Sequence, residues 1–284
     1  MVAPRETEQL ARERRVVFNA DDLGMGPGVE LAILRAARAG IVREVSVSVT
    51  RAVPREALAE LVDLGVGIGL HFNLTDGVAL GGPLRGLTDA TGRFRGLPAA
   101  LAATTARVMS AAQTARELAL QLEALADWAP LSHVNGHHHV HVFPGLCDVV
   151  LRGARRAGIH HVRSLSQPRW VLPDRSPRGL LLRGLGARFE RRLLGEGFEV
   201  RPLVGLALTG QSEYRLRFWQ QAQSVAPGRY EWLVHPVHAG GGPALAFGAR
   251  LGSDEELAVL EAPETRERLA ALDIRPCRFH ELGP

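Results

Sequence analysis

A cluster of histidines lies near the middle of the sequence, where His133, His137, His138, His139 and His141 fall within nine residues. They account for five of the protein's eleven histidines. Imidazole is the commonest metal ligand among protein side chains, so this density indicates a metal site. The alternative interpretation is a polar turn, or an incidental metal-binding tract that carries no chemistry.

Other polar residues follow apolar segments at the points where predicted strands end. The strands are predicted at 16–18, 66–70, 131–134, 160–163 and 230–234, and the polar residues at their ends are Asp21 and Asp22, His71, His137, Arg163 and His235. In parallel sheets, and above all in barrels, functional residues project from the carboxyl ends of strands. We therefore expect these side chains to meet on one rim.

The alternation of strands and helices predicts a parallel sheet with helical crossovers, which is an α/β fold. Helices are predicted at 26–39, 55–64, 113–128, 145–157, 179–194, 213–224, 253–261 and 264–272, and further strands at 45–49, 199–200, 204–208 and 277–281. Residues 76–110 are rich in Gly, Pro and Thr and are predicted to be an irregular excursion. A glycine-rich loop is expected at 239–251. No linker divides the chain, so we expect a polar leader at 1–15 and a single domain at 16–284.

Composition excludes several classes of protein. All 34 basic residues are arginine, but 30 acidic residues leave a formal charge of only +4, and aromatic residues make up 5% of the chain. No arginine run is interleaved with aromatic residues, so we do not expect nucleic-acid binding. Two cysteines exclude a disulfide framework and favour a reducing cytoplasm. We expect no secretory signal, because residues 1–15 are charged and lack an apolar region, and no apolar run is long enough to span a membrane.

Asp22, His71 and His137 would supply one carboxylate and two imidazoles, a set that leaves positions on a divalent ion open for water and substrate. Adjacent residues at a strand end point to opposite sides. One aspartate of the Asp21–Asp22 pair could therefore bind metal while the other takes a proton from water. The alternative for this pair is a helix cap or turn, and His71 alone could be an ordinary buried histidine.

Two further residues are candidates for proton transfer and substrate contact. His235 precedes a proline, which favours an extended backbone, and its side chain could donate a proton to a leaving amine. The alternative for His235 is an exposed loop histidine. Arg163 could hold a substrate oxygen, pair with Asp21, or be a surface arginine.

These motifs resemble those of the YdjC-like carbohydrate deacetylases, a group that includes chitooligosaccharide deacetylases and hopanoid-biosynthesis-associated deacetylases. The segments that carry the resemblance lie at 19–24, 69–75, 133–141 and 232–236. The resemblance implies a distorted (β/α) barrel similar to that of the polysaccharide deacetylases. It also implies a divalent metal held by Asp22, His71 and His137, with Asp21 as the base and His235 as the acid.

We accordingly expect a hydrolase that removes the acetyl group from an N-acetylated amino sugar or a sugar-bearing metabolite by means of metal-activated water. Asn73, Thr75, His139 and Arg163 are the predicted substrate-binding residues, and the cofactor is one divalent cation, Zn²⁺ or Mg²⁺. The resemblance implies a homodimer. The alternatives are a phosphoesterase or esterase that uses the same site, and a protein that binds metal or sugar without turnover.

The sequence departs from the family pattern in two places. Asn135 stands where many members have aspartate, an exchange more typical of the hopanoid-associated branch, which puts chitooligosaccharides in doubt as the substrate. His238 and the glycines at 240–242 replace the usual continuation after His235 and Pro236. This second departure could reshape the leaving-group side of the pocket.

Overall fold

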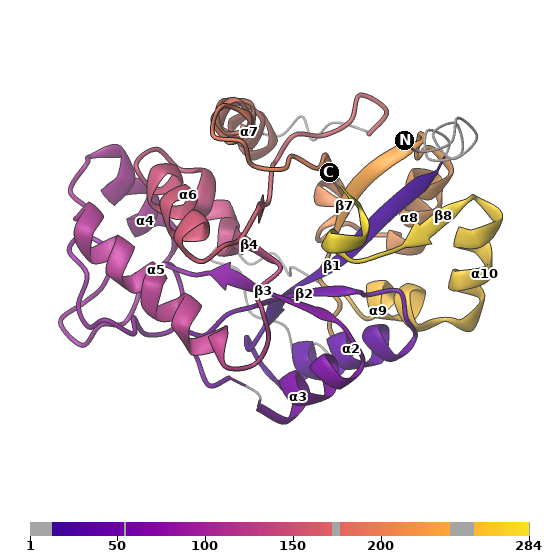
Figure 1. Ribbon diagram of the computed structural model, residues 1–284, viewed down its shortest axis with the longest axis horizontal. Coiled ribbons are helices and arrows are strands. Elements are labelled where there is room, and N and C mark those ends of the chain that lie inside the picture. The colour runs from indigo at the N-terminus through magenta and orange to yellow at the C-terminus, as the bar shows by residue number, and fades with distance from the viewer. Residues whose placement is uncertain (1–12, 54, 172–176, 239–252, 284) are drawn as a thin grey trace.

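The protein is seen in a computed structural model that describes residues 13–53, 55–171, 177–238 and 253–283. In this part of the chain, eight parallel strands form one curled sheet with helices around it (Figure 1). The strand order is β5-β4-β3-β2-β1-β7-β6, and β8 pairs with the first residues of β1. The strands are β1 (Arg14–Leu23), β2 (Glu44–Val47), β3 (Gly67–Phe72), β4 (His133–Gly136), β5 (His161–Val162), β6 (Leu203–Val204), β7 (Gly228–Val234) and β8 (Ile274–Pro276).

The two ends of this strand order approach each other. His161 of β5 forms a parallel bridge with Glu199, which lies just before β6. The backbone N–H of Leu203 in β6 donates a hydrogen bond of 2.6 Å to the carbonyl of Ser166 beyond β5. The distorted (β/α) barrel expected from the sequence is therefore confirmed.

Helices cover the outside of the curled sheet (Figure 1). They are α2 (Pro27–Arg38), α3 (Arg55–Asp63), α4 (Leu97–Thr105), α5 (Ala111–Ala126), α6 (Leu146–Arg156), α7 (Pro177–Gly195), α8 (Tyr214–Gln223), α9 (Asp254–Glu261) and α10 (Pro263–Ala271), with short 3-10 helices η1 (His137–Val142), η2 (Leu206–Leu208) and η3 (Phe279–Glu281). The eight predicted helices are all present, with ends shifted by a few residues. Helix α4 was not predicted, so the excursion at 76–110 is not wholly irregular.

The central strand β1 separates two different interiors. Its residues Val16, Phe18 and Ala20 belong to the main apolar core beneath the helices. Val17, on the opposite face, packs in a small separate cluster with the C-terminal residues Cys277, Phe279 and Leu282. Because side chains alternate along a strand, Asn19 and Asp21 follow Val17 on the barrel side, where both are buried. The barrel interior is consequently polar above a small apolar base.

Several predicted strands differ from those observed. The segment predicted as a strand at 199–200 forms only an isolated bridge, from Glu199 to His161, and the strand predicted at 131–134 is found at His133–Gly136. Strand β1 begins at Arg14, inside the predicted leader, and continues to Leu23. The last strand is Ile274–Pro276, because the segment predicted at 277–281 turns into η3. The strand predicted at 204–208 stops at Val204, because Gly205 adopts a left-handed φ of 89° and η2 follows. The glycine-rich loop at 239–251 and residues 1–12 of the leader lie outside the described residues.

The polar barrel interior leads to a test at Gly69 in β3. A Cβ atom at this position would lie 2.3 Å from the His133 ring, which is fully buried and hydrogen-bonded through both nitrogens. We expect Gly69→Ala to lower the free energy of unfolding by about 1–3 kcal/mol, the usual cost of overpacking. Urea denaturation measures this change.

The matched control is Gly184→Ala in α7. A Cβ atom there would meet no atom within 4 Å, and alanine in a helix is favoured over glycine by about 0.5–1 kcal/mol. The control should therefore be neutral or stabilising. Equal denaturation midpoints for Gly69→Ala and the unsubstituted protein would contradict the crowding at His133.

Candidate active site

Asp22, His71 and His137 lie together at the carboxyl ends of β1, β3 and β4. All three are buried, and their ligand atoms lie within 4.8 Å of one another. His137 Nδ1 is 2.9 Å from Asp22 Oδ1, and His71 Nε2 is 3.1 Å from the same oxygen and 3.3 Å from His137 Nδ1. Ligand atoms around a tetrahedral Zn²⁺ with bonds near 2.0–2.1 Å lie roughly 3.3 Å apart. The three donors therefore fit a divalent ion with only small shifts.

Unusual backbone conformations bring these donors together. Asp22 has a left-handed φ of 73°, a conformation that non-glycine residues seldom adopt. It interrupts the alternation of β1, so that both Asp21 and Asp22 contact histidines of the candidate site. His138 and His139 also have positive φ values of 52° and 58°, and the chain folds back immediately after His137. Such strain is typical of functional sites.

Asn135 determines which nitrogen of His71 faces the other donors. Its side-chain amide donates hydrogen bonds to Asp21 Oδ1 at 2.9 Å and to Ser46 Oγ at 2.7 Å. The remaining Asn135 Oδ1 must therefore accept from His71 Nδ1, 2.6 Å away. Because Nδ1 carries the proton of this bond, Nε2 of His71 is the atom available to an ion.

The electrostatics of this group favour a cation. Burial alone would raise the pKa of Asp22, but the charges and hydrogen bonds of His137 and His71 hold that pKa well below its usual value. Burial alone would lower the pKa of His71, but the Asp21 and Asp22 carboxylates raise it. Two carboxylates in a buried site that stabilise a positive charge on a histidine would equally attract a divalent cation.

Asp21 is held by a fully buried arginine. Arg163 donates to Asp21 Oδ2 at 2.5 Å and to Oδ1 at 2.9 Å, and it also pairs with Glu231 at 2.6 Å. Burial would raise the pKa of Asp21, but the Arg163 charge outweighs it and keeps the carboxyl ionised. The interpretation of Arg163 as a surface arginine is wrong, and its contacts are those of the predicted pairing with Asp21. A substrate contact of Arg163 stays a prediction.

His235 approaches the same carboxylate from the end of β7. Its Nε2 is 3.8 Å from Asp21 Oδ2, while its backbone N–H donates to Glu256 Oε1 of α9 at 2.8 Å. Burial lowers the pKa of His235, and the two aspartates only partly offset this effect. His235 is buried, which excludes an exposed loop histidine.

The other predicted substrate-binding residues have structural contacts. Asn73 is fully buried; its amide donates to Ser48 and Thr50, and its Oδ1 accepts from the backbone N–H of Thr75. The Thr75 hydroxyl lies 3.0 Å from His138 Nδ1. His139 is buried in η1, with its ring centroid 6.3 Å from that of His141. Their roles toward a substrate stay predictions.

Three residues around the site were not identified from the sequence. Glu231 lies inside β7, where a strand offers no local signal, and Glu256 comes from a helix beyond the glycine-rich loop. His141 contacts the backbone carbonyl of Arg163 through Nε2 at 3.0 Å, and thereby braces that residue. The density of the histidine run was the only available signal for His141.

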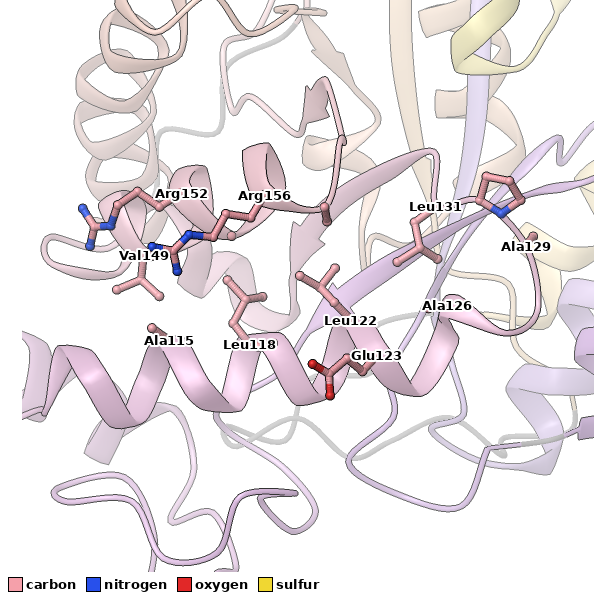
Figure 2. Close-up of a pocket in the computed structure, with 14 residues that line it drawn as sticks. Ala115, Leu118, Leu122, Glu123, Ala126, Ala129, Leu131, Val149, Arg152 and Arg156 are labelled. Carbon is pink, nitrogen blue, oxygen red and sulfur yellow. The ribbon is translucent and has the colours of Figure 1, made fainter.

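A separate apolar groove lies between α5 and α6 (Figure 2). Its volume is about 450 Å³, and Leu118, Leu122 and Val149 line it, with Arg152 and Arg156 extending over it from α6. None of the candidate site residues lines this groove. The candidate site at the strand ends is therefore separate from this groove.

The fold and site together define an α/β barrel protein with a candidate metal centre on its rim. The chain belongs to the family described as YdjC-like protein, whose profile matches residues 15–271. The resemblance drawn from the four sequence segments is thus confirmed over most of the chain.

Individual relatives agree with this membership. The chain is 27% identical over 278 residues to a carbohydrate deacetylase of Brevibacillus brevis, covering 95% of this chain and 100% of that protein. A chitooligosaccharide deacetylase from Enterobacter sp. strain 638 is 31% identical over 150 residues, which are 52% of this chain and 58% of the relative. A solved structure from Enterococcus faecalis V583, named for suspected cellobiose-phosphate cleavage, has a TM-score of 0.68 at 18% identity and covers 95% of this chain and 99% of its own. That likeness shows the shared fold.

No helix among the residues that the structure describes is both long and apolar enough to cross a membrane.

Asn135 provides a test of the donor arrangement. Asn135→Leu keeps the branch at Cγ but removes the acceptor for His71 Nδ1, so we expect Zn²⁺ to bind roughly 10–100-fold more weakly, as when other outer hydrogen-bond partners are lost. Isothermal titration with Zn²⁺ measures this loss. Asn135→Asp keeps an acceptor and should retain most of the affinity. Unchanged affinity in the leucine variant, with the fold intact by circular dichroism, would refute this role of Asn135.

Glu256 predicts a pH dependence of stability. Burial raises the pKa of Glu256 to about 7, above the value near 4.3 of an unfolded chain. The folded state then holds the proton more tightly, so its stability is full below the unfolded pKa and is lost as pH rises through the folded pKa. Relative to Glu256→Gln, the unsubstituted protein should lose up to about 3 kcal/mol of unfolding free energy between pH 4 and 8.

Urea denaturation across this pH range measures the difference. Glutamine still offers an acceptor to the His235 N–H, so the geometry is preserved. Glu267→Gln is the matched control, because Glu267 is exposed on α10 and its replacement should leave the pH profile unchanged. Parallel profiles for Glu256→Gln and the unsubstituted protein would show that Glu256 titrates normally.

Proposed function

We propose that the protein is a metal-dependent hydrolase that removes the acetyl group from an N-acetylated sugar or a sugar-bearing metabolite. The observation that carries this proposal is that Asp21 lies close both to the candidate metal ligands and to a histidine that could act as an acid. The donors Asp22, His71 and His137 gather beside it, and His235 Nε2 lies 3.8 Å from its Oδ2. Relatives named carbohydrate deacetylase and chitooligosaccharide deacetylase support the same reaction.

Asp22, His71 and His137 would hold the divalent ion, which supplies Lewis acidity to the acetamide carbonyl and to a water molecule. Asp21, ionised and fixed by Arg163 and Asn135, takes the proton of the attacking water. His235 is the acid that protonates the departing amine. Two imidazoles in the donor set favour Zn²⁺ or another transition metal over Mg²⁺.

The alternative reactions have less support from the site. A dinuclear phosphoesterase needs a second group of ligands, and the described residues contain one group that could hold an ion. A protein that binds sugar or metal without turnover has no need of a base and an acid beside the donors. The homodimer and the cytoplasmic location stay predictions, from the resemblance and from the cysteine content respectively.

Asp21→Asn tests the proposed reaction. Acetate release is measured over a panel of N-acetylated mono- and oligosaccharides and glycosylated metabolites, with chelated enzyme and with enzyme reconstituted with Zn²⁺ or Mg²⁺. Removal of the general base should lower kcat by about 10²–10⁴-fold, while the bound metal, measured by elemental analysis, is retained. Chelation should abolish release.

Asp63→Asn is the matched control, because Asp63 is exposed at the end of α3 and its loss should leave kcat unchanged. Since Asp21 also neutralises Arg163, circular dichroism must show that the Asp21 variant is folded, and His235→Gln provides a second variant on the acid side. Release that persists without metal or without Asp21 would overturn the proposal. Activity confined to phosphoesters would support the rival reaction.

A further inference from the structure

Helix α7 (Pro177–Gly195) lies outside the barrel and packs on η1, the 3-10 helix that carries the histidine run. Figure 1 shows it nearly end-on at the top of the molecule, apart from the sheet. Leu182, Phe189 and Leu193 are buried on its inner face. The Phe189 ring packs against that of His141, with the centroids 5.6 Å apart. This anchoring face fixes which side of the helix is turned outward.

The outward face of α7 carries exposed leucines. Leu180, Leu181 and Leu194 are 57%, 51% and 61% exposed. Among the described residues, only Leu216 of α8 is another large hydrophobic side chain that is more than half exposed. Single exposed leucines are ordinary on protein surfaces, but Leu180 and Leu181 are adjacent at the start of α7 and Leu194 adds a third near its end. No described part of the chain covers them.

Arginines lie between these leucines. Arg183, Arg188, Arg191 and Arg192 are all exposed. Arg192 pairs with Asp148 of α6 and with Glu196. In the part of the chain that the structure describes, no carboxylate lies within ion-pair distance of the other three arginines. The helix therefore presents several uncompensated positive charges.

The grooves beside α7 are also bordered by arginines. A groove of about 500 Å³ lies between α7 and the 165–171 loop, where Arg169 and Arg183 line it together with Glu190. On the other side, a groove of about 380 Å³ is lined by Arg188 and Arg191. Positive side chains therefore border α7 at both grooves, an arrangement that complements an anionic surface.

We propose that the outward face of α7 binds the surface of an anionic lipid bilayer. Exposed leucines can enter the boundary of the acyl chains, and arginines beside them can pair with headgroup phosphates, and both contacts contribute to binding at a membrane interface. Nucleic acid would contact the arginines but not the three leucines. A protein partner would need a surface complementary to the exposed side of this one helix. The interaction goes beyond the deacetylation reaction and does not depend on it.

The contact between Phe189 and His141 puts the proposed membrane-binding helix close to the candidate active site. Helix α7 packs directly on η1, which carries His137. A bilayer bound to the outer face of α7 would therefore lie one helix away from the candidate active site. Peripheral binding of this kind requires no membrane-spanning helix.

Co-sedimentation with vesicles tests the proposal on the full chain. Vesicles that contain both phosphatidylcholine and anionic phosphatidylglycerol are compared with vesicles of pure phosphatidylcholine. The protein should bind the anionic vesicles and not the neutral ones. Arg188→Gln with Arg191→Gln should weaken binding about 25-fold, at roughly fivefold for each arginine. Leu180→Ser with Leu181→Ser should weaken it about 10-fold or more.

Arg85→Gln with Arg116→Gln is the matched control, because it removes two exposed arginines that lie away from α7. This variant should bind anionic vesicles only slightly more weakly, because its net positive charge is lower. A fluorescence measurement separates insertion from adhesion: Leu180→Trp should shift to shorter wavelength and be quenched by brominated lipids, whereas Leu216→Trp on α8 should not.

Failure of the protein to bind anionic vesicles would overturn the proposal. So would equal losses in the α7 and control variants, which would show attraction by overall charge alone. Binding that needs the arginines but not the leucines, without quenching of Leu180→Trp, would point to a soluble polyanion and against a bilayer. Thermal denaturation confirms that each variant is folded, and acetate release reports separately on the active site.

Discussion

The site depends on one constraint, which is that the charges inside the barrel must neutralise each other away from water. Arg163 is fully buried and divides its donors between Asp21 and Glu231. A buried arginine with no carboxylate would cost several kcal/mol, so this triad requires β1, β5 and β7 to keep their relative positions. The same requirement fixes the carboxylate of Asp21 beside His235. Structural and chemical roles therefore cannot be separated for these residues.

The rest of the interior extends this arrangement toward the base of the barrel. Asn19 donates to Glu231 and contacts His133, which lies beside Glu44. Glu44 in turn accepts the backbone N–H of Phe279, whose ring stacks on His161. Glycines at 67 and 69 leave the space that the Glu44 and His133 side chains occupy. Polar networks of this kind specify one register of strands, because a slip would leave buried groups without partners.

Much of the site could be predicted because parallel strands bring their carboxyl ends to one rim. Asp22, His71 and His137 come from distant parts of the sequence, yet each follows an apolar run, and that rule was sufficient to bring them together. The rule does not predict contacts made by residues that lie outside the strand ends. Glu256 belongs to a helix that follows the glycine-rich loop, and no periodicity connects it to His235. The left-handed φ of Asp22 is imposed by tertiary contacts, and nothing local in a polar pair of aspartates indicates it.

The adjacent aspartates show how environment, and not residue type, separates two roles. Asp22 lies against the imidazoles of His71 and His137, whereas Asp21 is held by the Arg163 guanidinium and the Asn135 amide, with His235 farther away at 3.8 Å. Arg163 holds Asp21 ionised but also makes it a weak base, because the pKa of the carboxyl is lowered. A weak base accepts a proton readily only from an acidic donor. The reaction proposed for Asp21 would therefore need an ion held by Asp22, His71 and His137, because a bound divalent ion lowers the pKa of its water. In that proposal neither half of the site is useful without the other.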